Sequence, residues 1–490
     1  MKSAKFILFT ALFLLTVSIG TMSALGISAP YFLLLLFVLF SASSYFLEKN
    51  IFAYDNHIFV FIWIVCILHH SAALTTGLPV GYILEFIIFG LFIPIIASIW
   101  TRARHDVFLR LFLLLFSTHL ICGFLSTYFG RSHFFAALWQ LQFNLKWPLM
   151  FLLGYSMVDS TRVKIILGKI TFVSLIFISV VILLSLIAPD IYSVLFGNIS
   201  DGTGNPILNT STRFSGPFFH SSALALYSAF FSLVALTYYL DSKKPSWLFI
   251  SLSYTIILLL SGQRQELLGY IMCVFLIIYL AYHSYRIITL FVVLTALTLV
   301  SLIFASIQWL PFEAEFADWG FLFSEKQQSA RAITTIQGLK IAEMYIPLGS
   351  GLGTFAGPGA QKYDLSFYHD LGFMKYYWFR KGLFLVDTYW PNIIAETGYV
   401  GFAMLFFILM IMWLSLFSRT LKAIKTPLFY FNLLALCALT IMLSTSVTSP
   451  NMADPRYSFL LWLIIGAAFK ASNAELFIIS REPIRTKPCS

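Results

Sequence analysis

The sequence predicts an all-α fold, a polytopic helical membrane protein of about 14 transmembrane helices with a large helical cap formed by one outer loop. Hydrophobic residues make up 59% of the 490 residues and charged residues only 11%, whereas soluble domains carry about 25% charged residues. Apolar stretches of about 20 residues, each long enough to cross a hydrocarbon core of about 30 Å, recur along the chain. These observations exclude a soluble enzyme and a disordered chain, and they favour a single integral membrane domain over residues 1–490.

Apolar windows between charged residues define the predicted spans. The first window follows Lys5 and has no clear cleavage site, so we expect a spanning helix rather than a signal peptide. The windows cover residues 6–24, 29–47, 57–74, 81–100, 107–127, 134–157, 166–188, 218–240, 247–261, 267–283, 287–307, 392–417, 427–447 and 457–472.

The distribution of charge predicts the orientation. The chain has 31 Lys and Arg against 21 Asp and Glu, a net charge of +10. More than half of the Lys and Arg fall in the connections that lie inside if the N-terminus is cytoplasmic, as the positive-inside rule requires. We therefore expect both termini in the cytoplasm, and we attribute the positive charge to membrane topology rather than to binding of nucleic acid.

Two predicted outer connections, residues 189–217 and 308–391, are much longer than the rest and are where function is expected. The longer one contains a stretch of helical period over 327–345, followed by a glycine-rich turn. We expect it to fold as a cap of short helices. The five cysteines show no C-x-x-C spacing, so neither a disulfide framework nor a metal site is predicted.

The first candidate motif is Arg213-Phe-Ser-Gly-Pro-Phe-Phe-His220, where the shorter outer loop meets a span. A guanidinium at the positive end of a helix dipole can donate two hydrogen bonds to a phosphate. The alternatives are an arginine whose charge lies at the lipid headgroups and a histidine that hydrogen-bonds between helices.

The second motif is the hairpin Ser261-Gly-Gln-Arg264-Gln-Glu, which places Arg264 on the same outer side as Arg213. Two arginines together suit a pyrophosphate, because one cation would leave part of its charge unneutralised. The alternative is an ordinary solvated turn between two helices.

The third motif lies in the long loop, where Arg331 precedes Pro347-Leu-Gly-Ser-Gly351-Leu-Gly. A glycine-rich turn can bring backbone N–H groups close to phosphate, but no Gly-Lys-Ser/Thr follows, so a P-loop is excluded. The alternative is a tight turn that closes the cap.

The fourth motif enters the twelfth predicted span. Asp387 lies just outside the membrane, Tyr389 and Trp390 follow it, and Glu396 lies inside the helix, next to glycines that allow close packing.

The order of these four motifs resembles that of the O-antigen ligase and polymerase superfamily over about residues 213–410. In that pattern, an Arg-x-x-Gly loop is followed by a Ser-Gly-x-Arg hairpin, an arginine-bearing helix leading to Pro-Leu-Gly-x-Gly, and a Glu-x-Gly-x-x-Gly helix. The ligase branch typically has a His-Asn pair before the last motif. This chain has Asp387-Thr-Tyr389 there, which is more similar to Wzy-type repeat-unit polymerases.

The resemblance implies inverting glycosyl transfer at the periplasmic face of the bacterial inner membrane, without a metal or other cofactor. The donor and the acceptor are glycans linked to undecaprenyl pyrophosphate, and a chain-length regulator protein is an implied partner. Arg213 and Arg264 stabilise the leaving pyrophosphate and Asp387 is the candidate base. The candidate substrate-binding residues are Arg331, His220, Tyr389, Trp390, Glu396 and Gly351.

Aromatic residues of the expected cap have apolar faces and polar edges that suit sugar rings, although each also suits a protein core or the headgroup region. They are Trp319, Tyr363, Tyr376, Tyr377, Trp378, Tyr389 and Trp390. Intramembrane polar residues outside the motifs are candidates for function or for hydrogen bonding inside the bundle. They are Glu85, Gln140, Gln142, Asn144 and Lys146.

Two alternatives to a polymerase stay open. One is a ligase or O-oligosaccharyltransferase of the same superfamily. The other is a lipid-linked oligosaccharide flippase or secondary transporter, for which charged or broken helices around a cavity at the membrane midplane are expected.

Overall fold

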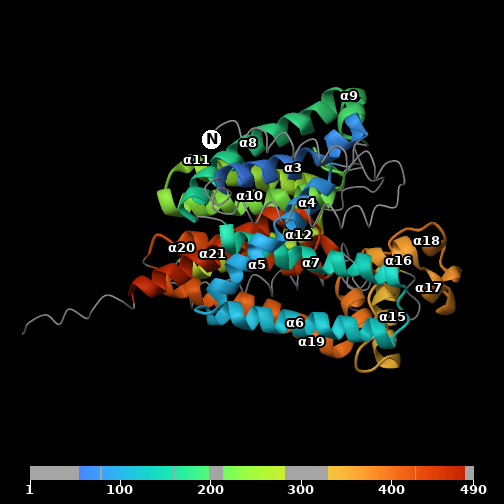
Figure 1. Ribbon diagram of the computed structural model, residues 1–490. Coiled ribbons are helices and arrows are strands. Elements are labelled where there is room, and N and C mark those ends of the chain that lie inside the picture. The colour runs from blue at the N-terminus through green and yellow to red at the C-terminus, as the bar shows by residue number, and fades with distance from the viewer. Residues whose placement is uncertain are drawn as a thin grey trace, which may run out of the picture.

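Helices are the only regular secondary structure of the described residues, and no β-strand occurs among them (Figure 1). The computed structural model describes residues 55–77, 80–157, 160–197, 213–281, 329–424 and 426–479. The helices of the first half are α3 (Asp55–Thr76), α4 (Tyr82–Gly90), α5 (Phe92–Ala103), α6 (Val107–Phe129), α7 (Phe134–Met157), α8 (Ser160–Ile187), α9 (Pro189–Phe196), α10 (Ser221–Ser242), α11 (Pro245–Ser261) and α12 (Arg264–Ala281). Those of the second half are α15 (Ala330–Met344), α16 (Pro358–Tyr363), α17 (Ser366–Asp370), η3 (Phe373–Lys375), α18 (Tyr377–Arg380), α19 (Trp390–Lys422), α20 (Phe429–Ser446), η4 (Pro450–Met452) and α21 (Pro455–Ile479).

Within the described ranges, seven helices are long and apolar enough to cross a membrane, namely α3, α6, α8, α10, α12, α19 and α20. The bent pair α4 and α5 makes an eighth if it is counted as one span. The prediction of a helical membrane protein is thereby confirmed. The predicted spans 134–157, 247–261 and 457–472 form α7, α11 and α21, whereas those at 6–24, 29–47 and 287–307 lie outside the described residues.

The predicted span 81–100 is a broken helix rather than a continuous one. Helix α4 ends at Gly90, and the later part of α5 is bent from it by 47°. Pro94 lies in the sequence just after this break, and a proline has no N–H to continue the helical hydrogen bonding. The break therefore follows from the local sequence, which the apolar window did not take into account.

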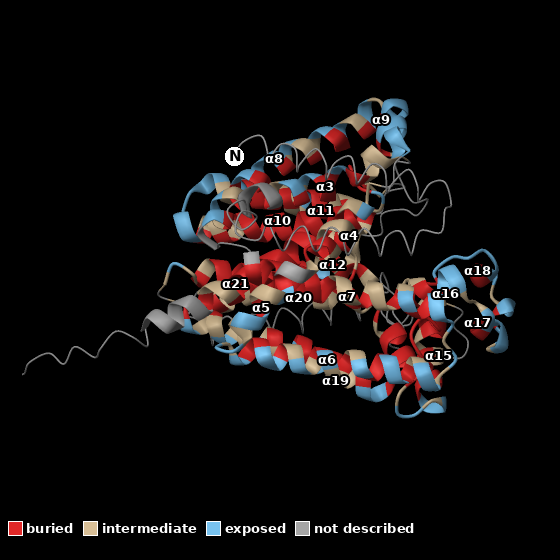
Figure 2. Ribbon diagram, in the orientation of Figure 1, coloured by how far each residue is buried: buried red, intermediate tan, exposed pale blue. Residues whose placement is uncertain are grey.

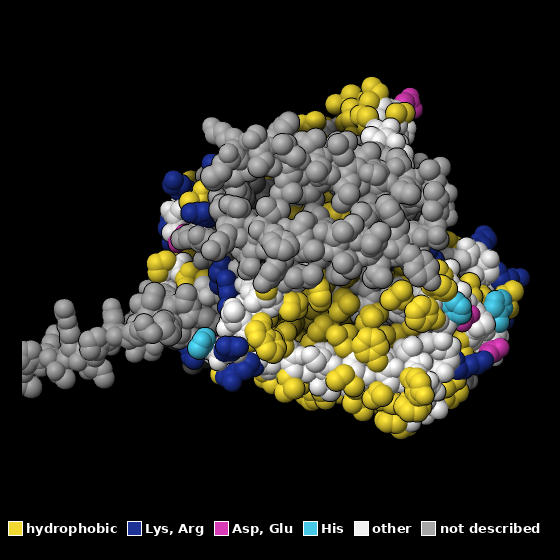
Figure 3. Space-filling view, in the orientation of Figure 1, with side chains coloured by type: hydrophobic (Ala, Val, Ile, Leu, Met, Phe, Trp, Pro, Cys, Tyr) yellow, Lys and Arg dark blue, Asp and Glu magenta, His cyan; other side chains and the backbone are white. Residues whose placement is uncertain are grey.

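Burial divides the bundle into central and peripheral helices (Figure 2). Helices α10 and α20 are central, with 83% of their apolar windows buried, whereas α6, α8 and α3 bury about 33–39% of theirs. In the coloured part of Figure 3, apolar side chains cover the area between the two ends of the molecule, and Lys and Arg side chains gather at those ends. Many large apolar side chains of the bundle are exposed, among them Leu114, Phe124 and Phe407, which is the pattern of a lipid-facing surface.

The connections between helices gather at two opposite ends of the bundle. At one end, the Phe214 N–H donates to the Leu260 carbonyl and the Trp390 Nε1 donates to Ser446. We call this the site end. At the other end, Lys164 pairs with Asp241 at 2.7 Å. The connections at the site end and those at the opposite end are the two sets that the charge distribution assigns to opposite sides of a membrane.

Residues 330–389 form a helical unit at the site end, with a small core of their own that includes Phe355, Tyr368 and Trp378. We call it the 330–389 segment. Its first helix, α15, confirms the predicted helix over 327–345. It begins at Ala330 because the Ser329 side chain accepts a hydrogen bond from the Ala332 N–H at 3.2 Å. The remainder of the expected loop, residues 308–328, lies outside the described ranges.

Helix α19 is interrupted at Gly398, where φ is 65° and ψ is −172°. A straight helix of its 33 residues would extend about 50 Å, well beyond a hydrocarbon core of about 30 Å. The positive φ suits glycine, which has no Cβ. The break leaves residues 390–397 beside the 330–389 segment, while the rest of α19 runs along α6 (Figure 1).

Candidate functional site

The Arg213 loop and the Arg264 hairpin lie against each other at the site end. The Phe214 N–H donates to the Leu260 carbonyl at 3.4 Å, and the Gln263 Nε2 donates to the Ser221 Oγ at 2.7 Å. Helix α9 also supports the loop, because the Tyr192 hydroxyl donates to the Gly216 carbonyl at 2.7 Å. Two motifs separated by about 50 residues in the sequence are thus held together, as the prediction of a shared anion site requires.

Glu266, in the first turn of α12, is the residue of this site that the sequence analysis left without a role. It is 1% exposed, and its Oε2 has no hydrogen-bond partner in the described structure. Its carboxylate interacts electrostatically with Arg331 and with Arg213. Burial is the dominant influence on this carboxyl, and the two arginines, which come from other segments, offset only part of the cost of burying its charge. The sequence contained the hint, an acidic residue two positions after Arg264, but no pattern showed that it is buried.

Arg331 joins this neighbourhood from α15. Its Nη2 lies 3.5 Å from the Asp387 Oδ2, and the two side chains are 35% and 36% exposed. The Arg331 Nε is buried without a partner among the described residues, as is the Thr388 Oγ1 next to Asp387. Buried polar atoms are nearly always hydrogen-bonded in folded proteins. A polar ligand bound between Arg331 and Glu266 would complete the hydrogen bonding of the Arg331 Nε and the Glu266 Oε2.

Gly351 and Glu396 hold the glycine-rich turn against the broken helix. The break at Gly398 leaves the carbonyls of Ala395 and Glu396 to accept hydrogen bonds from the N–H groups of Ser350 at 2.9 Å and Gly351 at 3.1 Å. Glu396 is fully buried, and its Oε1 accepts from the Phe355 N–H at 3.1 Å. Both residues were predicted to bind substrate. In the structure the Gly351 N–H and the Glu396 Oε1 bond to the protein's own backbone, while the Glu396 Oε2 has no partner among the described residues.

The other predicted substrate-binding side chains are dispersed. The His220 Nδ1 accepts from the Ser222 N–H at 3.1 Å and caps α10. Tyr389 is 1% exposed and belongs to the main core, where its ring packs edge-on against Trp390. Trp390 is half-buried, and its Nε1 donates to Ser446 at 3.0 Å.

The aromatic residues of the 330–389 segment divide into core and surface. Trp378 is buried in the small core, with Tyr376 stacked on it at 5.4 Å between ring centroids. Tyr363 and Tyr377 are exposed, and Trp319 lies outside the described residues. Tyr363 packs edge-on against Trp139 of α7, and the Lys362 Nζ lies 3.6 Å from the Trp139 ring centroid. Burial lowers the pKa of Lys362, and the charge of Glu85 partly offsets this shift.

The intramembrane polar residues form two hydrogen-bonded groups. In the first, the Lys146 Nζ pairs with the Glu85 Oε1 at 2.7 Å, and the Gln142 Nε2 donates to the Glu85 Oε2 at 3.0 Å. In the second, the Gln140 Nε2 donates to Asn144 and to Asn392, which links α7 to the start of α19. Both groups satisfy their own hydrogen-bonding requirements, as expected for residues that join helices.

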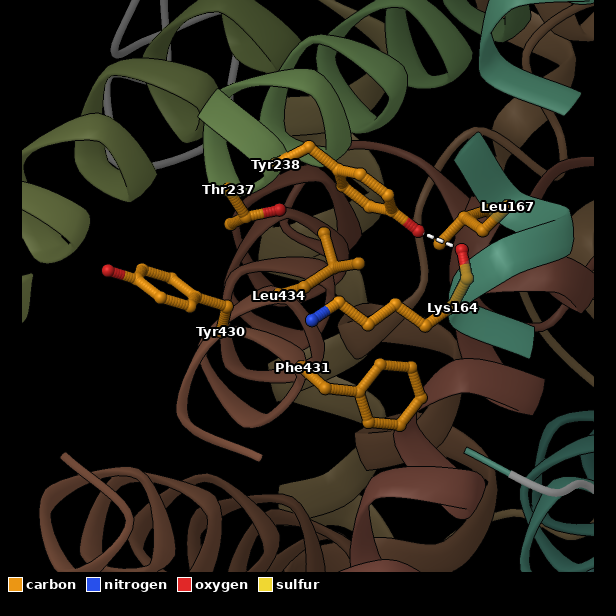
Figure 4. A pocket seen from close by; sticks show the side chains of 7 residues that line it. All are labelled: Lys164, Leu167, Thr237, Tyr238, Tyr430, Phe431 and Leu434. Atoms are coloured by element: carbon orange, nitrogen blue, oxygen red, sulfur yellow. Dashed lines mark hydrogen bonds between the residues drawn. The ribbon is translucent and has the colours of Figure 1, made fainter. Parts of the chain in front are cut away.

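The described residues also contain a pocket at the end opposite the Arg213 loop. A small apolar pocket at the opposite end is lined by Lys164, Leu167, Thr237, Tyr238, Tyr430, Phe431 and Leu434 (Figure 4). The Tyr238 hydroxyl donates to the Lys164 carbonyl there, and the Lys164 amino group pairs with Asp241. Nowhere in the described ranges do three or more His, Cys, Asp or Glu side chains gather as they would around a metal ion.

We call Arg213, Arg264, Glu266, Arg331 and Asp387 the arginine site. Its residues come from the Arg213 loop, from α12, from α15 and from the segment entering α19. No protein-family model and no curated protein matches this chain.

Proposed function

We propose that the protein polymerises undecaprenyl-pyrophosphate-linked oligosaccharide repeat units into a surface polysaccharide at the periplasmic face of the bacterial inner membrane. The observation that supports this most directly is the arginine site. Two arginines and an Arg331–Asp387 pair lie at one end of an apolar bundle, beside buried polar atoms that have no partner among the described residues. Such a site suits a ligand that is anionic, carries hydroxyl groups and has a lipid tail that stays in the membrane.

In the proposed reaction, an acceptor hydroxyl attacks the anomeric carbon of the donor glycan. The bond between this carbon and the pyrophosphate oxygen breaks, a glycosidic bond forms with inversion, and undecaprenyl pyrophosphate leaves with the electron pair. Arg213 and Arg264 stabilise the charge that develops on the leaving group. Asp387 accepts the proton of the attacking hydroxyl, and Arg331 holds Asp387 in place.

On this proposal, the site end faces the periplasm and the 330–389 segment is the periplasmic cap. The full chain has about 14 spans, with both termini in the cytoplasm. The distribution of Lys and Arg supports this orientation, because the exposed Lys243 and Lys244 lie in a connection at the end opposite the arginine site.

Reconstitution tests the proposal. The purified protein in lipid nanodiscs should convert short lipid-linked repeat units into a ladder of longer chains, without lipid A, without ATP and in the presence of EDTA. The Arg213→Ala variant should form no ladder, while Arg380→Ala, which alters an exposed arginine of α18, should behave as wild type. Transfer only to lipid A would indicate a ligase, and movement of lipid-linked units without elongation would indicate a transporter. Either result would reject the polymerase.

A further inference from the structure

Glu266 is buried at the point where the arginine site meets the helix bundle. It occupies the first turn of α12 at 1% exposure, and its Oε2 has no partner among the described residues. A carboxylate is an acceptor only, so the unpartnered oxygen requires a donor. Burial without such a donor is unfavourable, which makes this oxygen a place where a ligand group is expected.

The neighbours of Glu266 define which ligand fits. Arg213 and Arg331 interact with it electrostatically as cations, and Arg331 also pairs with the carboxylate of Asp387. Helix α20 packs along α12, and Thr448, just after α20, donates a hydrogen bond to Gln265. Tyr457 of α21 also interacts electrostatically with Glu266. The ligand must therefore offer an anionic part to the arginines and, directly beside it, a hydrogen-bond donor to Glu266.

We infer that Glu266 binds the sugar attached to the pyrophosphate of the donor, by accepting a hydrogen bond from a hydroxyl or amide N–H of that sugar. The inference rests on the proposed function, since it assumes that the arginines bind the pyrophosphate. It assigns Glu266 to recognition of the first sugar rather than to the leaving group. The site then distinguishes a glycosylated lipid from the bare pyrophosphate lipid that the reaction releases, and this difference favours product release.

Binding of two lipids to the purified protein separates these roles. Glu266→Ala should weaken binding of the repeat-unit donor about tenfold or more, because a site built to accept a hydrogen bond discriminates strongly against its loss. It should leave the affinity for sugar-free undecaprenyl pyrophosphate unchanged, and this second measurement also shows that the variant is folded. Glu266→Gln, which keeps an oxygen acceptor at the same place, should recover part of the affinity for the donor.

Matched variants make the outcomes distinct. Arg213→Ala should weaken the binding of both lipids, and Glu343→Gln, on the exposed face of α15, should change neither. Equal weakening of both lipids by Glu266→Ala would show that Glu266 acts through the arginines, and unchanged binding of both would show that it has no role in recognition. Either result would overturn the inference and leave the proposed function standing. Failure of the wild-type protein to bind either lipid would overturn both.

Discussion

Arg331 and Asp387 are separated by 56 positions in the sequence, yet the Arg331 Nη2 lies 3.5 Å from the Asp387 Oδ2. The contact joins α15 to the segment that enters α19. Although they contact each other, the two side chains are each about one third exposed, so a substrate can approach both of them. On the proposed function, this arrangement supports Asp387 as the base.

Replacement of Asp387 by Asn should therefore lower the rate of chain growth about 10²- to 10⁴-fold, the usual contribution of a general base. The rate would be measured as elongation of lipid-linked repeats by the reconstituted protein. Asp370→Asn is the control, because Asp370 also pairs with an arginine, Arg131 at 2.7 Å, but lies on α17. Wild-type rates from Asp387→Asn would assign the base elsewhere.

The arginines should act as directional donors rather than as general positive charge. Lys at position 213 or 264 keeps the charge but loses the planar pair of donors. We expect Lys to recover part of the activity and Ala almost none, with unchanged amounts of protein in the membrane. Full activity of both Ala variants would leave these arginines as residues of the headgroup region.

The packing of the glycine-rich turn against α19 predicts a difference between two glycines of similar backbone conformation. Gly349 has φ 82°, and a Cβ there would overlap the backbone nitrogen of Gly398. Gly372 has φ 75° with nothing within 4 Å of the position that a Cβ would take. Gly372→Ala should cost about 1–2 kcal/mol for the conformation alone, and Gly349→Ala about 1–3 kcal/mol more for the overlap. Thermal unfolding in detergent measures both, and equal costs would contradict this packing.

The proposed orientation predicts which cysteines a membrane-impermeant reagent can modify in intact cells. Lys381 is exposed in the 330–389 segment and Lys243 is exposed at the opposite end. A cysteine at 381 should be labelled from the periplasm, and one at 243 only after the membrane is permeabilised. Gly359 is unsuitable for the experiment because it is buried against the Ala136 carbonyl. The reverse labelling pattern would place the arginine site in the cytoplasm.

Tyr368 predicts a loss of stability at high pH. Burial raises the pKa of Tyr368 well above its usual value of about 10, and its hydroxyl accepts a hydrogen bond from the Ala356 N–H at 2.5 Å. Because the unfolded chain loses this proton first, the stabilisation is complete below about pH 10 and decreases above it, by about 1.4 kcal/mol per pH unit. Tyr368→Phe should reduce the slope of unfolding temperature against pH between 9 and 11. Tyr377→Phe, at 60% exposure, should not change it.

The sequence predicted the helical membrane fold and the helix over 327–345, because apolar length and helical period are local properties. The break between α4 and α5 was missed, since an average over an apolar window does not register the effect of one proline. The proximity of the Arg213 loop to the Arg264 hairpin was expected from topology alone. The burial of Glu266 and Tyr389 was not, because burial depends on which helices pack together, and a single sequence does not contain that information.

The hydrogen bonds that residues 350 and 351 donate to the carbonyls of Ala395 and Glu396 affect how mutational scans of this protein should be interpreted. Substitution of Glu396 or Gly351 would loosen the turn and displace α15, and with α15 the side chain of Arg331. Such variants would lose activity as completely as variants of the arginine site, although neither residue need touch the substrate. A residue of this region can therefore be essential because it positions Arg331 and not because it contacts the substrate. Measuring binding separately from turnover distinguishes these two roles.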